Sequence, residues 1–117
     1  MSTNKEVSTM QEQQVARWLD GEVVPQSGGG KFDKGDVVTD HLLFECKTVA
    51  KPRKSFSIKE RWLEKASEQA FEMGKYEWAL AFRFEPEGRD YYIIGKETML
   101  LAKDLIEDYY KTIEDVL

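Results

Sequence analysis

Apolar residues recur at spacings of three and four along residues 6–20. This spacing predicts an amphipathic helix, because positions three and four apart share one helical face. Gly21 is expected to end it, and residues 22–35, with Pro25 and several glycines, predict an aperiodic loop. The expected inward face of the helix is made by Val7, Met10, Gln14, Val15, Trp18 and Leu19.

Two runs of β-branched and apolar residues, 37–39 and 42–44, lie on either side of Asp40 and His41. They predict an antiparallel hairpin whose second strand continues through residues 45–49. Ser57, followed three residues later by Glu60, is typical of a capping box and predicts a helix from about 58 to 74. Its expected inward residues are Ile58, Trp62, Leu63, Ala66, Ala70 and Phe71.

Two further strands are predicted at 78–84 and 91–94, separated by a turn at 85–88. A final helix is predicted over 96–117. The order α-β-β-α-β-β-α favours an α/β fold, a single domain over 1–117 with a small mixed central sheet flanked by helices. The expected apolar side of the final helix is made by Leu100, Leu101, Leu105, Ile106, Tyr109 and Ile113.

Composition fits this picture. The chain has 117 residues, 41% of them hydrophobic, and no apolar run near the roughly 20 residues that a membrane-spanning helix needs, so no membrane partner is expected. One cysteine, Cys46, excludes an internal disulfide. The N-terminal segment lacks the apolar centre of a signal peptide, so a reducing, cytoplasmic location is expected.

The net charge of −5, taken alone, disfavours a nucleic-acid partner, but the charge is unevenly distributed. Residues 85–117 carry four basic and nine acidic side chains, whereas residues 31–65 carry nine basic and six acidic ones. The middle of the chain is therefore basic, and it becomes more so if some of its acids hold a cation.

Asp36 and the run Glu45-Cys46-Lys47 carry the clearest candidate chemistry. Side chains alternate along a strand, so Glu45 and Lys47 should share a face and Cys46 should point away. Asp36 opens the neighbouring strand and can reach the same end of the sheet. These two carboxylates, the Cys46 backbone carbonyl and waters would form an octahedral oxygen site suited to Mg²⁺ or Mn²⁺. Lys47 would then assist an attacking water.

These residues resemble the signature of the PD-(D/E)xK nucleases, and their surroundings resemble the Holliday junction resolvases of archaea and bacterial viruses. The resemblance covers residues 10 to about 84, with Gly35 in place of the proline that gives the family its name. It implies a restriction-endonuclease-like fold, Mg²⁺-dependent hydrolysis of DNA and a homodimer. It also implies a metal-site role for Glu12, a role near the scissile phosphate for Ser27, and a Gln69 directed at the metal.

Basic residues flank the candidate site on both sides in the sequence and are the natural phosphate contacts. The expected DNA-binding residues are Ser27, Lys31, Lys34, Lys51, Arg53, Lys54, Ser55 and Lys59.

Other interpretations stay open at this point. Glu45 and Lys47 could form an ion pair on a solvated sheet face, and Gln69 could be a surface residue. Glu6 or Glu22 could replace Glu12, and Asp33 could replace Asp36. Ser27 and His41 could be turn residues, Cys46 is expected to be an inert core thiol, and the basic run could simply be solvated.

The sequence therefore predicts a Mg²⁺-dependent endonuclease that resolves four-way DNA junctions. One alternative is a nuclease of the same type acting on linear, flap or nicked DNA. The other is a DNA-binding module of the same fold that has lost turnover.

Overall fold

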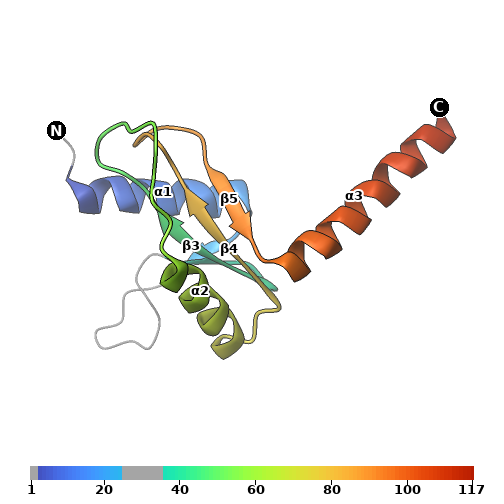
Figure 1. Ribbon diagram of the computed structural model, residues 1–117, viewed down its shortest axis with the longest axis horizontal. Coiled ribbons are helices and arrows are strands. Elements are labelled where there is room, and N and C mark those ends of the chain that lie inside the picture. Colours follow the sequence, from blue (N-terminus) through green and yellow to red (C-terminus); the bar gives the residue numbers. More distant parts are fainter. Residues whose placement is uncertain (1–2, 25–35) are drawn as a thin grey trace.

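The computed structural model describes residues 3–24 and 36–117. In this part of the chain it contains three helices and a five-stranded mixed sheet, which confirms the expected α/β class (Figure 1). The elements in chain order are α1 (Asn4–Trp18), β1 (Glu22–Val23), β2 (Val37–Val38), β3 (Leu42–Lys47), α2 (Glu60–Glu72), β4 (Glu77–Phe82), β5 (Tyr91–Ile94) and α3 (Lys96–Val116).

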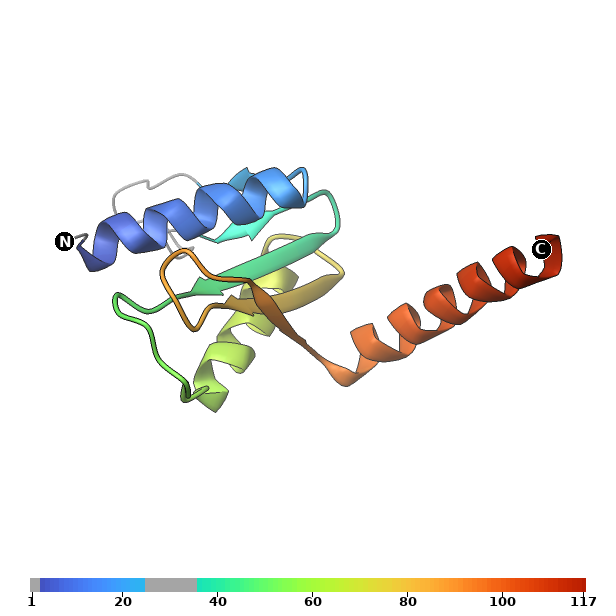
Figure 2. The same cartoon turned by 90° about the horizontal axis from the view of Figure 1, so that it is seen from above.

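The strands lie in the sheet in the order in which they occur in the chain. β3 and β4 are parallel, because α2 carries the chain back between them, and the other neighbours are antiparallel. The hairpin expected around Asp40 and His41 is confirmed as β2–β3. Helices α1 and α2 cover opposite faces of the sheet, and α3 projects away from it (Figures 1 and 2).

Each face of the sheet has its own apolar core. Residues paired across β3 and β4 point to the same face, so Phe44 and Ala79 meet α1 while Leu43 meets α2. The buried cluster beneath α1 is Val15, Val37, Phe44, Ala79 and Ala81. The cluster beneath α2 is Leu43, Ala66 and Ala70.

Strand β1 lies where a loop was expected, so that part of the expectation is wrong. Glu22 pairs with Val38 and Val23 with Val37. A strand of two residues is too short to show a period in the sequence, and it forms here because β2 offers it a free edge. Gly21 permits the approach, because a Cβ there would lie 2.7 Å from the carbonyl oxygen of Val38.

Two aromatic residues expected to point inward are exposed. Trp18 is 81% exposed and Phe71 is 84% exposed. The buried positions of α1 are Val7, Gln11 and Val15, spaced by four, and Trp18 falls outside that line. On α2 the buried face is centred on Ala66 and Ala70, and Phe71 lies about 100° further round the helix.

The predicted capping box is also wrong. α2 begins at Glu60 with Lys59 as its N-cap and without a side-chain capping bond, so Ser57 does not cap it. The helix end is confirmed within two residues, and Gly74 follows it with a φ of 72°, a left-handed conformation that glycine adopts at little cost. None of the described helices is both long and apolar enough to cross a membrane.

α3 has the expected length but not the expected packing. None of its residues is buried, so its apolar side does not form part of the core. Its first turn is joined to the body by a hydrogen bond of 2.5 Å from the Thr98 hydroxyl to Glu77 Oε2.

Candidate functional site

The face of β3 that meets α2 presents Glu45 and Lys47, as alternation predicted. Lys47 Nζ lies 3.2 Å from Glu45 Oε1 and 4.7 Å from the centre of the Trp62 ring. Glu45 is only 4% exposed. The two residues do form an ion pair, but the sheet face that carries it is covered by α2. The alternative of a pair on a solvated sheet face is therefore wrong.

Asp36 immediately precedes β2 and is 1% exposed. Val37 pairs with Phe44, and the same antiparallel register, carried one residue further, sets Asp36 beside Glu45. The Asp36 carbonyl accepts a hydrogen bond of 2.7 Å from the Val24 amide, which holds this end of β2 against the segment that follows β1. Topology thus brings together the two carboxylates that lie nine residues apart in the sequence.

Glu12 lies on α1 and is partly buried. Burial raises the pKa of its carboxyl above the ordinary 4.5, and the negative charge of Glu45 raises that pKa further. The charge of Glu45 on β3 therefore acts on Glu12, although Glu12 lies on α1. Glu6 and Glu22, the alternatives considered for this role, are both exposed.

One oxygen of this acidic group, Glu45 Oε2, is buried and has no hydrogen-bond partner among the residues that the structure describes. A buried carboxylate oxygen without a donor is costly, and a divalent cation is a partner that removes the cost. Glu45 with Asp36 beside it fits the two-carboxylate site predicted from the sequence. Among the described residues, however, no three His, Cys, Asp or Glu side chains are gathered closely enough to hold a metal ion by themselves. A cation there would need waters or backbone oxygens to complete its shell.

Cys46 points to the opposite face of β3 and packs against the core beneath α1. Burial, and then the charges of Glu12, Asp90, Asp36 and Glu45, raise the pKa of its thiol well above the usual range. The thiol therefore stays protonated, which agrees with the inert role expected for it. The predicted role of the Cys46 backbone carbonyl as a metal ligand stays a prediction.

Gln69 lies on the sheet side of α2 and is 5% exposed. The alternative that it is a surface residue is therefore wrong. The α2 side of the sheet is also the side on which β3 presents Glu45 and Lys47.

The basic segment between β3 and α2 is anchored near the candidate site. The amide of Arg53 donates a hydrogen bond of 2.8 Å to the carbonyl of Phe84, just beyond the end of β4. Lys47 pairs with Phe82 at that same end of the sheet. The exposed residues of this segment that were predicted to contact DNA are Lys51, Arg53, Lys54, Ser55 and Lys59. The remaining predicted contacts, Ser27, Lys31 and Lys34, lie outside the described residues, as does Asp33.

A buried polar network beside the site was not predicted from the sequence. Gln11 is 1% exposed, and its Nε2 donates to the carbonyls of Lys47 at 2.9 Å and Ala81 at 3.3 Å, and to Asp90 Oδ1 at 3.2 Å. Asp90 in turn binds Arg83 through two hydrogen bonds, of 2.7 and 2.9 Å. The signal that could have revealed Gln11 is its spacing of four from both Val7 and Val15.

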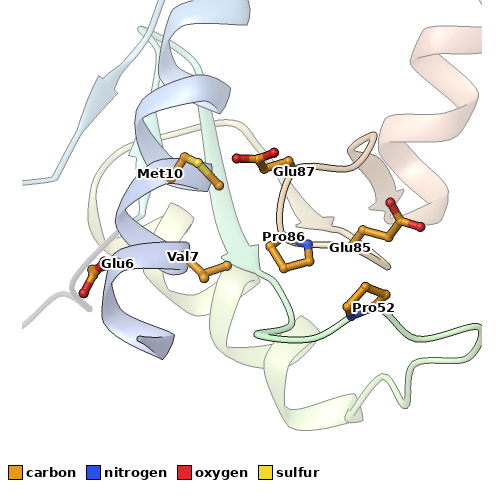
Figure 3. A pocket seen from close by; sticks show the side chains of 7 residues that line it. All are labelled: Glu6, Val7, Met10, Pro52, Glu85, Pro86 and Glu87. Carbon is orange, nitrogen blue, oxygen red and sulfur yellow. The ribbon is translucent and has the colours of Figure 1, made fainter. Parts of the chain in front are cut away.

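A hollow of about 490 Å³ lies between α1, the turn before β5 and Pro52 of the segment that joins β3 to α2 (Figure 3). Val7 and Met10 face Pro86 and Glu87 across it. Its lining includes Glu6, Glu85 and Glu87, with no basic side chain. Acidic side chains repel phosphate, so the inside of this hollow does not favour a nucleic-acid ligand.

Comparison of the chain with family models, with curated proteins and with solved structures gives no match.

Proposed function

We propose that this chain is a metal-dependent DNA endonuclease of the PD-(D/E)xK type, with a restriction-endonuclease-like fold, that hydrolyses phosphodiester bonds at four-way DNA junctions. The observation that carries the proposal is the buried, unpartnered Glu45 Oε2, with Asp36 set beside Glu45 by the sheet register and Lys47 at 3.2 Å. A buried carboxylate oxygen without a donor costs free energy unless a cation or a water molecule meets it.

In this proposal Asp36 and Glu45 hold Mg²⁺, for which Mn²⁺ can substitute, with the Cys46 carbonyl as a further ligand. Glu12 contributes directly or through water, since the charge of Glu45 already acts on it. The bound ion would supply Lewis-acid stabilisation of the phosphate and lower the pKa of an attacking water.

Lys47 is proposed to orient that water and to balance the charge that grows on the phosphate oxygens. Its ammonium is held between Glu45 and the Trp62 ring, so little conformational freedom is lost when substrate binds. Gln69 is proposed to act beside it from α2.

The exposed cations of residues 51–59 are proposed to bind the DNA backbone, since the Arg53–Phe84 hydrogen bond anchors them at the same end of the sheet. The partner is branched DNA. The compartment is proposed to be the cytoplasm, that of the host if a bacterial virus encodes the chain.

The test compares Mg²⁺-dependent cleavage of a four-way junction with cleavage of a linear duplex of the same sequence. We expect the junction to be cut preferentially, and Asp36→Asn and Glu45→Gln to lose at least about 100-fold in rate. Asp104→Asn, an exposed carboxylate on α3, is the matched control and should cleave like the wild type.

Equal cleavage by the wild type and by both site variants would show that the site is assigned wrongly. Equal cutting of both substrates would contradict the choice of junctions. Junction binding without product at any divalent-ion concentration would instead identify a DNA-binding module that has lost turnover.

A further inference from the structure

The long helix α3 presents an apolar surface that nothing in the described chain covers. Leu105 is 62% exposed, Tyr109 61% and Ile106 50%, and no residue of the helix is buried. Figures 1 and 2 both show the helix extending away from the sheet. Contiguous apolar surface of this kind marks an interaction site in a folded protein.

The apolar positions on α3 follow the spacing of a helical pair. They are separated alternately by three and four residues, which is the a and d pattern of a heptad repeat. The residues at these positions are Met99, Ala102, Ile106, Tyr109, Ile113 and Val116. Leu105 and Tyr110, at flanking g and e positions, widen the same stripe. The surface therefore fits another helix with its own apolar stripe.

The charges of α3 are sorted away from this stripe. Its six acidic residues all fall at the outer b, c and f positions of the heptad: Glu97, Asp104, Glu107, Asp108, Glu114 and Asp115. A basic partner would require acids along the contact, and DNA would be repelled by a helix with three basic and six acidic residues. A second α3 meets neither obstacle, because two copies can join their apolar stripes while their acids stay in water.

We propose that α3 is a dimerisation helix that pairs, along its a and d positions, with α3 of a second copy of this chain. Most of the stability of a helix in a protein comes from packing of its apolar face, so covering the stripe also explains how α3 persists outside the core. The inference specifies the surface of the homodimer expected for the proposed nuclease. Its test measures molecular mass and not cleavage. A monomer that still cleaves DNA would contradict the dimer alone, and a dimer that does not cleave DNA would contradict the proposed nuclease alone.

The experiment is sedimentation equilibrium of the full chain from low to high micromolar concentration. We expect a mass of twice the 13.6 kDa chain. The double variant Ile106→Glu/Ile113→Glu buries charge in the stripe and should raise the dimer dissociation constant at least about 100-fold. Leu100→Glu/Leu101→Glu is the matched control. It also introduces two glutamates in place of apolar residues, but at exposed b and c positions, and should stay dimeric.

Near-ultraviolet circular dichroism in the tryptophan band should show that both variants keep their fold, because all three tryptophans, Trp18, Trp62 and Trp78, lie outside α3. A monomeric wild type over the whole range would overturn the proposal, and so would a stripe variant that remains dimeric. Loss of the dimer in both double variants would show that the contact is not made by the a and d positions. A mass other than twice the chain would show that the occupant is not a single second copy.

Discussion

The side-chain amide of Gln11 donates a 2.9 Å hydrogen bond to the carbonyl oxygen of Lys47, so α1 is tied to the end of β3 that carries the candidate site. The same amide also donates to the Ala81 carbonyl and to Asp90 Oδ1. Helix α1 is thus hydrogen-bonded to β3, to β4 and to the residue that precedes β5. These bonds also hold in place the turn of α1 that carries Glu12, the next residue.

Replacing Gln11 by alanine is expected to lower the free energy of unfolding by about 2–3 kcal/mol, because one buried and two partly buried acceptors lose a donor and a cavity is left. Urea denaturation followed by circular dichroism measures the change. Gln13→Ala, at an exposed position of the same helix, should change stability by less than about 0.5 kcal/mol. Equal effects of the two substitutions would mean that the Gln11 contacts do not stabilise the fold.

Asp90→Asn should destabilise the protein by about 3 kcal/mol, since it leaves the Arg83 guanidinium buried without its counter-charge. The exposed pair Lys103–Asp104 provides the comparison, with Asp104→Asn expected to cost about 0.5 kcal/mol or less. Denaturation midpoints of the two variants in the same buffer give the difference. A small effect at Asp90 would show that water reaches Arg83 when the carboxylate is removed.

Glu12 should make the metal-free protein less stable as the pH rises. Because the pKa of its carboxyl is raised in the folded state, the folded chain binds that proton more tightly than the unfolded chain. The stabilisation is present below about pH 4.5, the unfolded value, and is lost as the pH rises through the folded pKa.

Glu12→Gln removes this loss. Between pH 4 and pH 7, the Tm of the metal-free variant should rise by about 2 °C relative to that of the wild type, a small shift because Glu12 is only partly buried. Addition of Mg²⁺ should stabilise the wild type more than the variant. Glu107→Gln, an exposed glutamate on α3, should show neither effect.

Lys47→Met is expected to reduce the rate of junction cleavage by about 10²–10⁴-fold while leaving Mg²⁺ binding intact. The thioether can occupy the space over Trp62, but it cannot donate to water or phosphate. Single-turnover cleavage and titration calorimetry separate the two quantities. A parallel loss of cation affinity would mean that Lys47 shapes the site rather than assisting the reaction.

Lys51→Ala/Lys54→Ala should weaken junction binding and reduce the slope of log K against log salt by about 1.8, the value for two lost phosphate contacts on duplex DNA. Fluorescence anisotropy at several salt concentrations measures the slope. Lys103→Ala/Lys111→Ala removes the same charge from α3 and should leave the slope unchanged. Equal slopes for both double variants would place the DNA elsewhere on the molecule.

Local patterns in the sequence predicted most of the elements. β5 and the long α3 were placed to within a residue, and the β2–β3 hairpin formed at Asp40 and His41. These succeed because alternation and helical spacing are set by residues that are neighbours in the chain. The exposed Trp18 and Phe71 show the limit, since spacing identifies a face but does not say how far the sheet beneath it extends.

By itself the sequence determined which residues could carry charge chemistry and that Glu45 and Lys47 share a face, because strand alternation is a local geometric property. Only the tertiary structure decided that Asp36 lies beside Glu45, that Gln11 and Gln69 are buried, and that α3 leaves the body uncovered. Those facts depend on strand register, on the edge that β2 offers to β1 and on the faces that α1 and α2 cover. Such relationships join residues distant in the chain, and their energies come from contacts that no local pattern contains.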